Sequence, residues 1–462
     1  MIALPGLNLS AQPSEPLNVP SSSATRTQEL SANTEYRFEV AFARALTIKL
    51  LTGTAEYFGT ELAPSSTYTF SGTKGAVFTW HGCKLEVGGE AESEYVAEET
   101  QMVGTVNAHF ALESLRERAV QTRDAGPRVL VVGPENAGKT SLVKSLTAYA
   151  VKSGRQPMVV NLDPRQGMLS VPGSLTAAAF SSIIDIEEGW GSSPISGPSP
   201  TPVKMPLVYH YGLRDAEEGK VFRPLVTRMA LAVTSRLEED PASKQAGFII
   251  DTPGGIGQGK AGQYENIEHI ISEFSVNVLF VLGSERLYSD LSRKYSTQGL
   301  TDPVHVVRLD KSGGCVDRTE EYMKALRHAQ IRAYFFGTGE TGLAPHSQSA
   351  GFDELNIFRI VEGTGINFND GGDAYGGTNG ESIYERLAPS GDIVNKLLAI
   401  TTAGATDGHG AIRDASVRGY MYVAEVDEAK KKVKLLSPQP GQVPQTAVVL
   451  GRWPEDVPSL VG

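Results

Sequence analysis

The sequence has little of several residue types that mark particular classes of protein. It contains only two cysteines, Cys83 and Cys315, which lie far apart in the chain and have no neighbours at metal-binding spacing. This scarcity excludes a disulfide framework and a zinc-finger type of site, and it favours a reducing compartment. The chain also has fewer basic than acidic residues, with 42 Lys and Arg against 53 Asp and Glu, and its net charge is −11. Such a balance argues against an extended, non-specific grip on nucleic acid, although a local basic groove is still compatible with it.

Long hydrophobic runs are missing as well. The longest apolar stretches, such as `NVLFVLG` (277–283), have the length of a buried strand and are too short to cross a bilayer. The N-terminal stretch `MIALPGLNLSAQPSEP` has neither a charged n-region nor a continuous apolar h-region, which argues against a secretory signal peptide. We therefore expect a soluble intracellular protein without a membrane segment.

The chain of 462 residues is long enough for about three domains at roughly 150 residues each. Residues 1–28 are rich in Ser, Pro, Gln and Thr without periodicity, which predicts a disordered tail. Residues 29–105 alternate apolar and polar side chains between glycine turns, which is typical of a small all-β sandwich. Residues 337–462 predict a C-terminal β-rich domain. Within it, `KKKVK` (430–434) fits a charged hairpin turn better than a nuclear address, because strand patterns flank it.

Residues 106–336 have a different pattern, in which near-continuous apolar strands alternate with helical segments. Strands of this kind predict a parallel sheet that is covered by helices on both faces. The predicted strands are `RVLVVG` (128–133), `PMVVNLD` (157–163), `LVYHYG` (207–212), `GFIIDTPG` (247–254), `NVLFVLG` (277–283) and `VHVVRLD` (304–310).

The stretch from Gly133 to Thr140 matches the phosphate-loop pattern G-x-x-x-x-G-K-[ST], with a strand pattern before it and a helix pattern after it. In such a loop Lys139 reaches the β and γ phosphates, and Thr140 offers its hydroxyl to Mg²⁺. The start of the following helix favours negative charge. The sequence therefore predicts nucleotide binding by an α/β protein with a central P-loop NTPase-type parallel sheet between an N-terminal all-β domain and a C-terminal β-rich domain.

Two acidic residues end predicted strands and so face the ligand crevice of a parallel sheet. Asp163 ends `PMVVNLD` and is a candidate Mg²⁺ ligand or general base, with a helix N-cap as the alternative. Gln166 is a plausible orienter of water or metal. Asp251 begins `DTPG`, which raises a GTPase alternative, but `RLDKSGG` (308–314) lacks the residue order that guanine recognition usually needs.

The stretch `GSERLYSDLSRKY` (283–295) predicts a helix with two arginines on one face. Arg286 and Arg293 are seven residues apart and therefore project two turns apart on that face. Such a pair suits a lid that closes over a phosphate undergoing transfer. The alternative is surface salt bridging, for example between Arg286 and Asp290 at i, i+4.

Together these stretches resemble the Clp-type polynucleotide 5′-hydroxyl kinases, and in particular the branch that serves pre-mRNA cleavage and polyadenylation. The resemblance covers nearly the whole chain beyond the tail. Besides the phosphate loop, its carriers are `TEYRFEV` (34–40), `LLTGTAEYFGTEL` (50–62), `AVFTWHGC` (76–83), `LDPRQG` (162–167), `SVPG` (170–173), `PLVYHYG` (206–212), `SERLYSDL` (284–291) and `KSGG` (311–314).

The resemblance implies that ATP with Mg²⁺ is the ligand and that the N-terminal domain helps to hold the adenine. It also implies a role for each matching position. Glu35 and Lys74 would contact the nucleotide, and Arg286 and Arg293 would be the lid arginines. Asp163 would be the base and, with Thr140, a Mg²⁺ ligand. The phosphates would bind Asn136, Ala137, Gly138, Lys139, Thr140 and Ser141.

One departure from the family pattern concerns the acceptor side. Active members have Thr-x-Gly-Trp after the fourth strand, and its indole stacks on the nucleic-acid end. Here `DTPGGIGQG` (251–259) puts Gly255 at that position. Stacking on an aromatic contributes roughly 1–3 kcal/mol per base, so its loss should weaken capture of the acceptor. The segment `GSSPISGPSPTP` (191–202) also looks longer than in active members.

The resemblance therefore implies an ATP-binding structural subunit of the nuclear mRNA cleavage and polyadenylation complex, which holds ATP without turnover and fastens its N-terminal domain through the nucleotide. Its expected partners are other subunits of that factor, especially the one that binds the RNA polymerase II C-terminal domain, and RNA is a further candidate. The alternative is an active kinase that transfers the ATP γ-phosphate to 5′-hydroxyl RNA ends.

Overall fold

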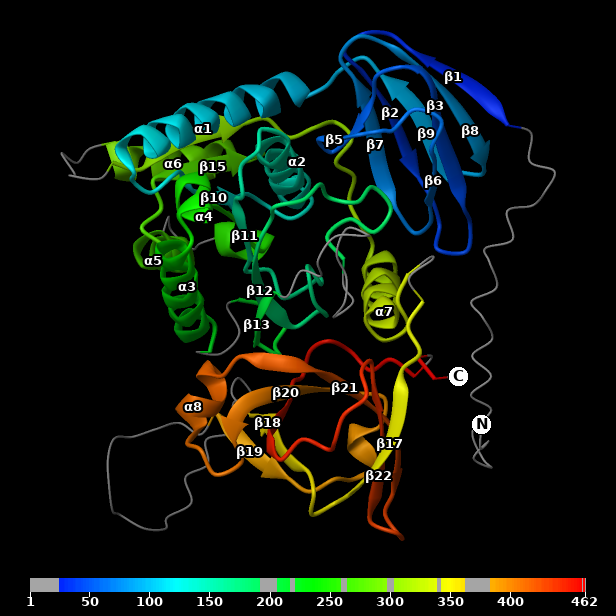
Figure 1. Ribbon diagram of the computed structural model, residues 1–462, viewed down its shortest axis with the longest axis vertical. Helices are drawn as coiled ribbons and strands as arrows, with labels where there is room; N and C mark the ends of the chain where they lie inside the picture. The colour runs from blue at the N-terminus through cyan, green and yellow to red at the C-terminus, as the bar shows by residue number, and fades with distance from the viewer. Residues whose placement is uncertain are drawn as a thin grey trace. The chain divides into compact units, whose positions relative to one another are not determined.

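The structure is a computed structural model that describes residues 25–191, 206–216, 221–258, 264–296, 303–338, 342–361, 383–458 and 460–461. The chain forms two compact units, Met1–Thr100 and Gln101–Gly462, and each is described by itself (Figure 1). Most of the predicted tail and, apart from Gly191, the predicted insertion lie outside the described residues. Within the described ranges, no helix combines the length and the apolar character needed to span a bilayer.

Unit 1 is the predicted β-sandwich, built from two antiparallel sheets in the orders β1-β8-β3-β6 and β5-β4-β7-β2-β9. Phe38 of one sheet packs against Phe70 of the other, with ring centroids 5.0 Å apart. β1 begins at Arg26, inside the range assigned to the tail, because it pairs with β8. The strands are β1 (Arg26–Leu30), β2 (Thr34–Glu39), β3 (Leu46–Gly53), β4 (Glu56–Tyr57), β5 (Thr60–Glu61), β6 (Thr67–Phe70), β7 (Lys74–Thr79), β8 (Cys83–Gly89) and β9 (Ser93–Ala97).

Unit 2 contains the central sheet, in the order β13-β12-β11-β14-β10-β15-β16. Six of its strands run in one direction, as predicted, and only β12 runs against its neighbours. The sequence pattern did not predict β12, whose three consecutive alanines carry no strand signal. The strands are β10 (Arg128–Val132), β11 (Met158–Asn161), β12 (Ser174–Ala179), β13 (Leu207–His210), β14 (Phe248–Asp251), β15 (Val278–Leu282) and β16 (His305–Leu309).

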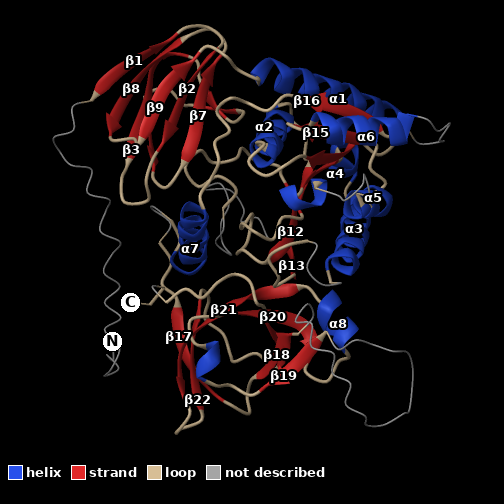
Figure 2. Ribbon diagram, turned by 180° about the vertical axis from the view of Figure 1, so that it is seen from behind, coloured by secondary structure: helices blue, strands red, loops and turns tan. Residues whose placement is uncertain are grey.

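Helices cover both faces of this sheet because its strands are apolar on both sides. In β10, Val129 and Val131 pack in one core with α1 and α2, whereas Leu130 and Val132 pack in the other with α3, α5 and α6 (Figures 1 and 2). The helices are α1 (Met102–Thr122), α2 (Lys139–Lys152), α3 (Phe222–Glu239), α4 (Pro241–Ala246), η1 (Gly254–Gly257), α5 (Glu265–Glu273), α6 (Glu285–Ser296) and α7 (Glu320–Phe336).

The C-terminal part of unit 2 is a second seven-stranded sheet, in the order β17-β22-β21-β20-β23-β18-β19. It shares a core with the central part, since Tyr334 of α7 packs against Tyr420 of β21 at 5.9 Å. `KKKVK` lies in the hairpin that joins β21 to β22. The elements are β17 (His346–Gly351), β18 (Asn356–Ile360), β19 (Tyr384–Leu387), η3 (Gly391–Ile393), β20 (Leu397–Gly404), α8 (His409–Asp414), β21 (Val417–Asp427), β22 (Lys432–Ser437) and β23 (Thr446–Leu450).

Candidate nucleotide-binding site

The phosphate loop, residues 133–138, connects the end of β10 to the start of α2. Gly138 is the N-cap of α2 and has a φ of 89°, in the left-handed region that favours glycine. A Cβ atom at this position would lie 2.8 Å from the Cys315 Sγ. The glycine is therefore required both by the backbone conformation and by the close approach of Cys315. It lets the loop turn tightly into a helix whose first N–H groups have no partner within the helix.

Lys139 places its ammonium inside this loop. Its side chain is buried, and Nζ donates a hydrogen bond to the Pro134 carbonyl at 2.8 Å. Burial lowers the pKa of Lys139, while the charges of Asp251 and Asp163 act in the opposite direction. A buried cation whose hydrogen-bond partner is a neutral carbonyl is well suited to receive an anionic phosphate.

Thr140 and Asp251 form a direct pair at the edge of the sheet. The Thr140 hydroxyl donates to Asp251 Oδ2 at 2.6 Å, and the Thr252 N–H donates to Asp251 Oδ1 at 3.0 Å. Burial raises the pKa of Asp251 to about 6, despite the bond from Thr140 and the charge of Lys139. A hydroxyl and a carboxylate are the hard oxygen donors that Mg²⁺ prefers.

Asp163 lies at the same edge, directly after β11. Its Oδ1 accepts the Arg165 N–H at 2.9 Å, and its own N–H donates to Asn161 Oδ1 at 3.0 Å. Asp163 thus caps a turn and no helix follows it, so the N-cap alternative is wrong. Burial raises the pKa of Asp163, against the charges of Lys139 and of two arginines.

The sequence analysis predicted Thr140 and Asp163 as the Mg²⁺ ligands. The structure adds Asp251 as a candidate, because Asp251 is the carboxylate that contacts Thr140. Over the described ranges, no group of three His, Cys, Asp or Glu side chains is arranged to hold a metal ion. This donor set, one hydroxyl and two carboxylates, fits Mg²⁺ that is also held by phosphate oxygens and water.

A residue that sequence reasoning missed, Arg318, also lies at the loop. Its Nε donates to Asn136 Oδ1 at 3.0 Å, and its Nη1 donates to Gln166 Oε1 at 3.2 Å. Asn136 belongs to the phosphate loop and Gln166 to the turn after Asp163, so Arg318 connects two segments of the site. The one available signal was its position four residues after the `KSGG` stretch.

Comparison with known proteins identifies the family of this chain. A family model described as "mRNA cleavage and polyadenylation factor CLP1 P-loop" matches residues 133–337. Two others, described as "N-terminal beta-sandwich domain of polyadenylation factor" and "Pre-mRNA cleavage complex II protein Clp1", match residues 29–119 and 343–455. The mRNA cleavage and polyadenylation factor CLP1 of Phaeosphaeria nodorum is 71% identical over the full length of both chains. This chain belongs to the Clp1 family.

Other Clp1 relatives agree with this assignment. The factor from Botryotinia fuckeliana is 51% identical, again over 100% of both chains. A solved complex of Clp1p with Pcf11p matches with a TM-score of 0.83 and 27% identity, covering 93% of this chain and 98% of the solved one. A second solved structure, with the same TM-score and identity, concerns the interface between Pcf11p and Clp1p and the basis for ATP loss in a point mutant.

The two lid arginines implied by the Clp1 resemblance are exposed on α6. Leu287 and Leu291 form the buried side of this helix. The Arg286 side chain is 73% exposed, and its Nε lies 3.9 Å from Asp290 Oδ2. The contact shown for Arg286 is thus the i, i+4 ion pair of the alternative interpretation, and closure of a lid by Arg286 and Arg293 stays a prediction.

The two adenine-side residues implied by the Clp1 resemblance belong to unit 1. Glu35 is buried, accepts a bond from Arg37 Nε at 2.8 Å, and also accepts one from the Thr100 hydroxyl. Lys74 forms an ion pair with Glu39, its partner across the β2–β7 ladder. Their role toward a nucleotide stays a prediction.

The position of the missing indole, Gly255, lies in η1. A Cβ atom built on Gly255 would have no described atom within 4 Å, whereas one on Gly254 would lie 2.4 Å from the Glu135 backbone nitrogen. Gly254 is therefore fixed by its contact with the phosphate loop. As far as the described residues show, Gly255 has space for a larger side chain.

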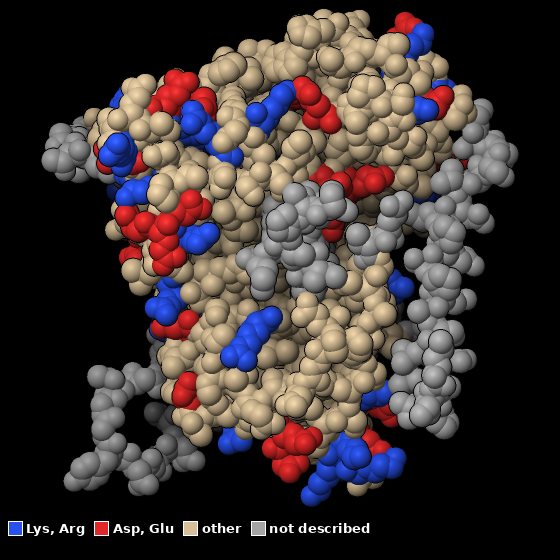
Figure 3. Space-filling model, viewed as in Figure 1, with Lys and Arg blue, Asp and Glu red and all other residues tan. Residues whose placement is uncertain are grey.

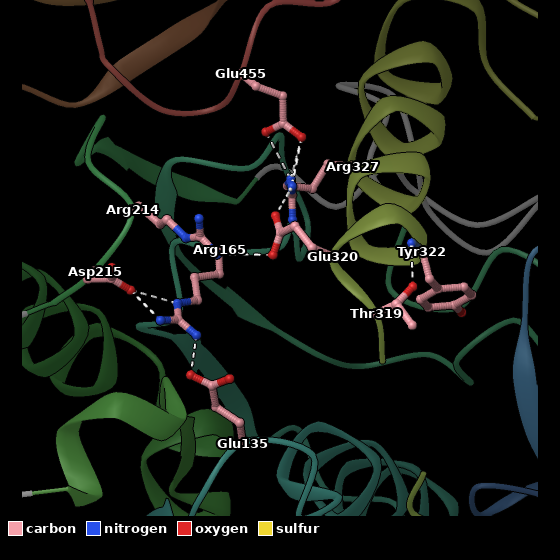
Figure 4. Close-up of polar contacts among 9 residues, drawn as sticks. All are labelled: Glu135, Arg165, Arg214, Asp215, Thr319, Glu320, Tyr322, Arg327 and Glu455. Atoms are coloured by element: carbon pink, nitrogen blue, oxygen red, sulfur yellow. Dashed lines mark hydrogen bonds and ion pairs between the residues drawn. The ribbon is translucent and has the colours of Figure 1, made fainter. Parts of the chain in front are cut away.

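Two ion pairs and one hydrogen bond hold the turn after Asp163. Figure 4 shows the ion pairs. Arg165 lies between Glu135 and Asp215 and is paired with both. The Trp453 Nε1 donates to the Pro164 carbonyl at 3.0 Å. The C-terminal segment after β23 therefore helps to fix the backbone beside Asp163.

Charges on the face drawn in Figure 3 are mixed, with basic and acidic groups interspersed over the described residues. On this face the basic groups of the described residues are scattered, apart from one cluster at the lower edge. The concentrated positive groups of the site are instead the individual cations Lys139 and Arg318 beside the phosphate loop.

Proposed function

We propose that this Clp1-family protein binds ATP with Mg²⁺ in its phosphate loop and keeps the nucleotide bound, without turnover, as a structural part of the nuclear mRNA cleavage and polyadenylation complex. One observation carries the proposal. On the phosphate side, Lys139 lies in the loop and Thr140 is bonded to Asp251, whereas on the acceptor side a Cβ on Gly255 would have no described atom within 4 Å.

In this proposal the chain's own residues bind and orient the nucleotide. Lys139 and the backbone from Asn136 to Ser141 hold the phosphates, and Thr140 with Asp251 and Asp163 would hold the Mg²⁺. When bound, Mg²⁺ neutralises phosphate charge. Glu35 and Lys74 are included as adenine contacts on the family resemblance.

The proposed partner is a subunit like Pcf11p, because the solved Clp1p chains that this chain resembles were solved in complex with Pcf11p. The resemblance further assigns to that partner the binding of the RNA polymerase II C-terminal domain. Co-purification of the tagged chain from its own cells, followed by mass spectrometry, tests this part. Recovery of the chain without any subunit of the cleavage factor would contradict it.

The test of ATP retention is direct. The full-length protein is purified without added nucleotide, denatured, and the released nucleotide is separated by ion-exchange chromatography. We expect ATP close to one per chain and little ADP. Lys139→Ala should abolish this content, whereas Lys152→Ala, at the exposed far end of the same helix, should not. Protein that contains no ATP and shows no thermal shift with added ATP and Mg²⁺ would refute the proposal.

Retained ATP also has a measurable effect on stability. A ligand that binds only the folded state stabilises it by about 2.7 kcal/mol at a hundredfold excess over its dissociation constant. Lys139→Ala should lose this increment and weaken complex assembly. If the variant kept both its heat stability and its partner binding, the structural role would fail.

The alternative function is the active kinase, and the burial of Asp163 beside Lys139 favours it. Asp163 would accept the proton of the RNA 5′-hydroxyl. The 5′-oxygen would bond to the γ-phosphorus, and ADP would leave. Arg286 and Arg293 would clamp the transferring group. Single-turnover transfer of labelled γ-phosphate to a 5′-hydroxyl oligoribonucleotide, abolished by Asp163→Asn, would establish this alternative.

A further inference from the structure

Arg318 differs from the other arginines around the site in what holds it. Its guanidinium is half-buried and donates to two neutral amide oxygens, Asn136 Oδ1 at 3.0 Å and Gln166 Oε1 at 3.2 Å. Among the described residues, no carboxylate lies within ion-pair distance of it.

The neighbouring arginines each have a carboxylate partner. Arg165 pairs with Glu135 and Asp215, and Arg327 pairs with Glu455 and Glu320, as Figure 4 shows. Arg214 pairs with Glu320, and Arg286 lies beside Asp290. A guanidinium whose hydrogen-bond acceptors are neutral amide oxygens can still pair with an anion, and its planar fork matches phosphate oxygens.

The position of Arg318 points to one part of the nucleotide. It contacts Asn136, three residues before the lysine that reaches the terminal phosphates, and Gln166, three residues after Asp163. Burial lowers the pKa of Lys139, and the charge of Arg318 adds to this lowering. The two cations therefore lie near each other beside the loop. The carboxylate of Asp163 interacts with both cations and offsets part of their mutual repulsion, and a bound phosphate would offset more of it.

We infer that Arg318 binds the terminal phosphate of the nucleotide, and that through it the protein distinguishes ATP from ADP. This assignment rests on the proposed ATP binding and deepens it. Asn136 and Gln166 act as positioning residues, since their amide oxygens hold the guanidinium toward the loop. The role falls to Arg318 because Arg286 is exposed and paired within its own helix.

The experiment measures affinity for the two nucleotides separately. Full-length protein is stripped with EDTA and charcoal, then titrated calorimetrically with ATP and, in parallel, with ADP in the presence of Mg²⁺. Arg318→Gln should weaken ATP binding by about ten- to hundredfold, the loss expected for a hydrogen bond between charged groups. ADP binding should change by less than about threefold.

Two further variants complete the design. Arg318→Lys keeps the charge without the fork and should lose part of the ATP affinity and none of the ADP affinity. It also serves as the test if Arg318→Gln fails to fold. Arg223→Gln is the matched control, because Arg223 likewise donates to an amide oxygen, Asn266 Oδ1 at 2.9 Å, but lies on α3 and pairs with Glu265. It should change neither affinity.

The outcomes separate this inference from the function on which it rests. Selective loss of ATP binding supports it. Equal loss of ATP and ADP binding, or no loss of either, overturns it while the proposed function stands. If the wild type binds neither nucleotide, the proposed function fails and the inference fails with it.

Discussion

The indole of Trp453 offers a sharp test of how the C-terminal segment supports the site. Its ring is buried and contacts two guanidinium groups, with Arg327 at 4.5 Å and Arg214 at 5.2 Å from its centroid. Its Nε1 donates to the carbonyl of Pro164, directly after Asp163. The perturbation is Trp453→Phe, which keeps an aromatic face but removes the donor, with Trp453→Ala as the larger truncation.

The expected magnitudes follow from these contacts. Trp453→Ala should reduce the free energy of unfolding by about 3–5 kcal/mol, as for other buried tryptophans. Trp453→Phe should reduce it by about 1–3 kcal/mol, because the buried Pro164 carbonyl loses its partner. Since Pro164 adjoins Asp163, we also expect Trp453→Phe to retain less ATP than the wild type.

The assay is urea unfolding followed by far-ultraviolet circular dichroism, because the variants lose a fluorescent reporter. Trp190→Phe is the control, since Trp190 is half-exposed and packs edge-on against Phe180 at 5.4 Å. It should change the free energy of unfolding by less than about 1 kcal/mol. If Trp453→Phe and Trp190→Phe proved equally stable and retained equal ATP, the anchoring role of the indole N–H would be refuted.

Three further predictions concern other positions. Gly138→Ala should abolish ATP retention, because left-handed backbone costs a non-glycine residue about 1–2 kcal/mol and the new Cβ would press on the Cys315 Sγ. Adding Cys315→Gly should restore retention only in part, so full recovery would exclude a backbone effect. Gly255→Trp should fold and retain ATP normally, and it should raise affinity for a 5′-hydroxyl oligoribonucleotide by about ten- to hundredfold; unchanged filter binding would contradict the stacking argument. Burial lowers the pKa of His210 to about 4, so its neutral form stabilises the fold above the unfolded-state pKa, and this contribution is lost as the pH falls from about 6.5 toward 4. Between pH 7 and pH 5 we expect it to remove about 2 kcal/mol in urea melts of the wild type. His210→Gln should lack that loss and the exposed-site control His346→Gln should keep it, so equal pH dependence in all three proteins would rule the contribution out.

Much of the fold could be predicted because its signals are local. The period-two alternation of Leu46, Ile48 and Leu50 in β3 sets one buried face of a sandwich strand. The continuous apolar run of β10 requires cover on both faces, and the two cores of the central sheet supply it. β12 was missed because its alanines carry no strand preference and become a strand only by pairing between β11 and β13.

The candidate site, too, could be predicted only where its signals are local in the sequence. The loop from Gly133 to Thr140 could be recognised within eight residues, because close approach to phosphates demands glycine and a lysine at fixed spacing. Asp251 was visible as the end of a strand, but its bond to Thr140, 111 residues away in sequence, was not. Neither Arg318, 182 residues from Asn136, nor Trp453, 289 residues from Pro164, gave a signal that could pair it with its partner.

By itself, then, the sequence determined which segments become strands and helices and where a phosphate can be bound, because backbone preference and burial period act over a few neighbouring residues. Only the tertiary structure decided which charged side chains meet at that loop. Those meetings depend on how the helices and the second sheet pack across the central sheet, and packing brings together positions that no local pattern connects.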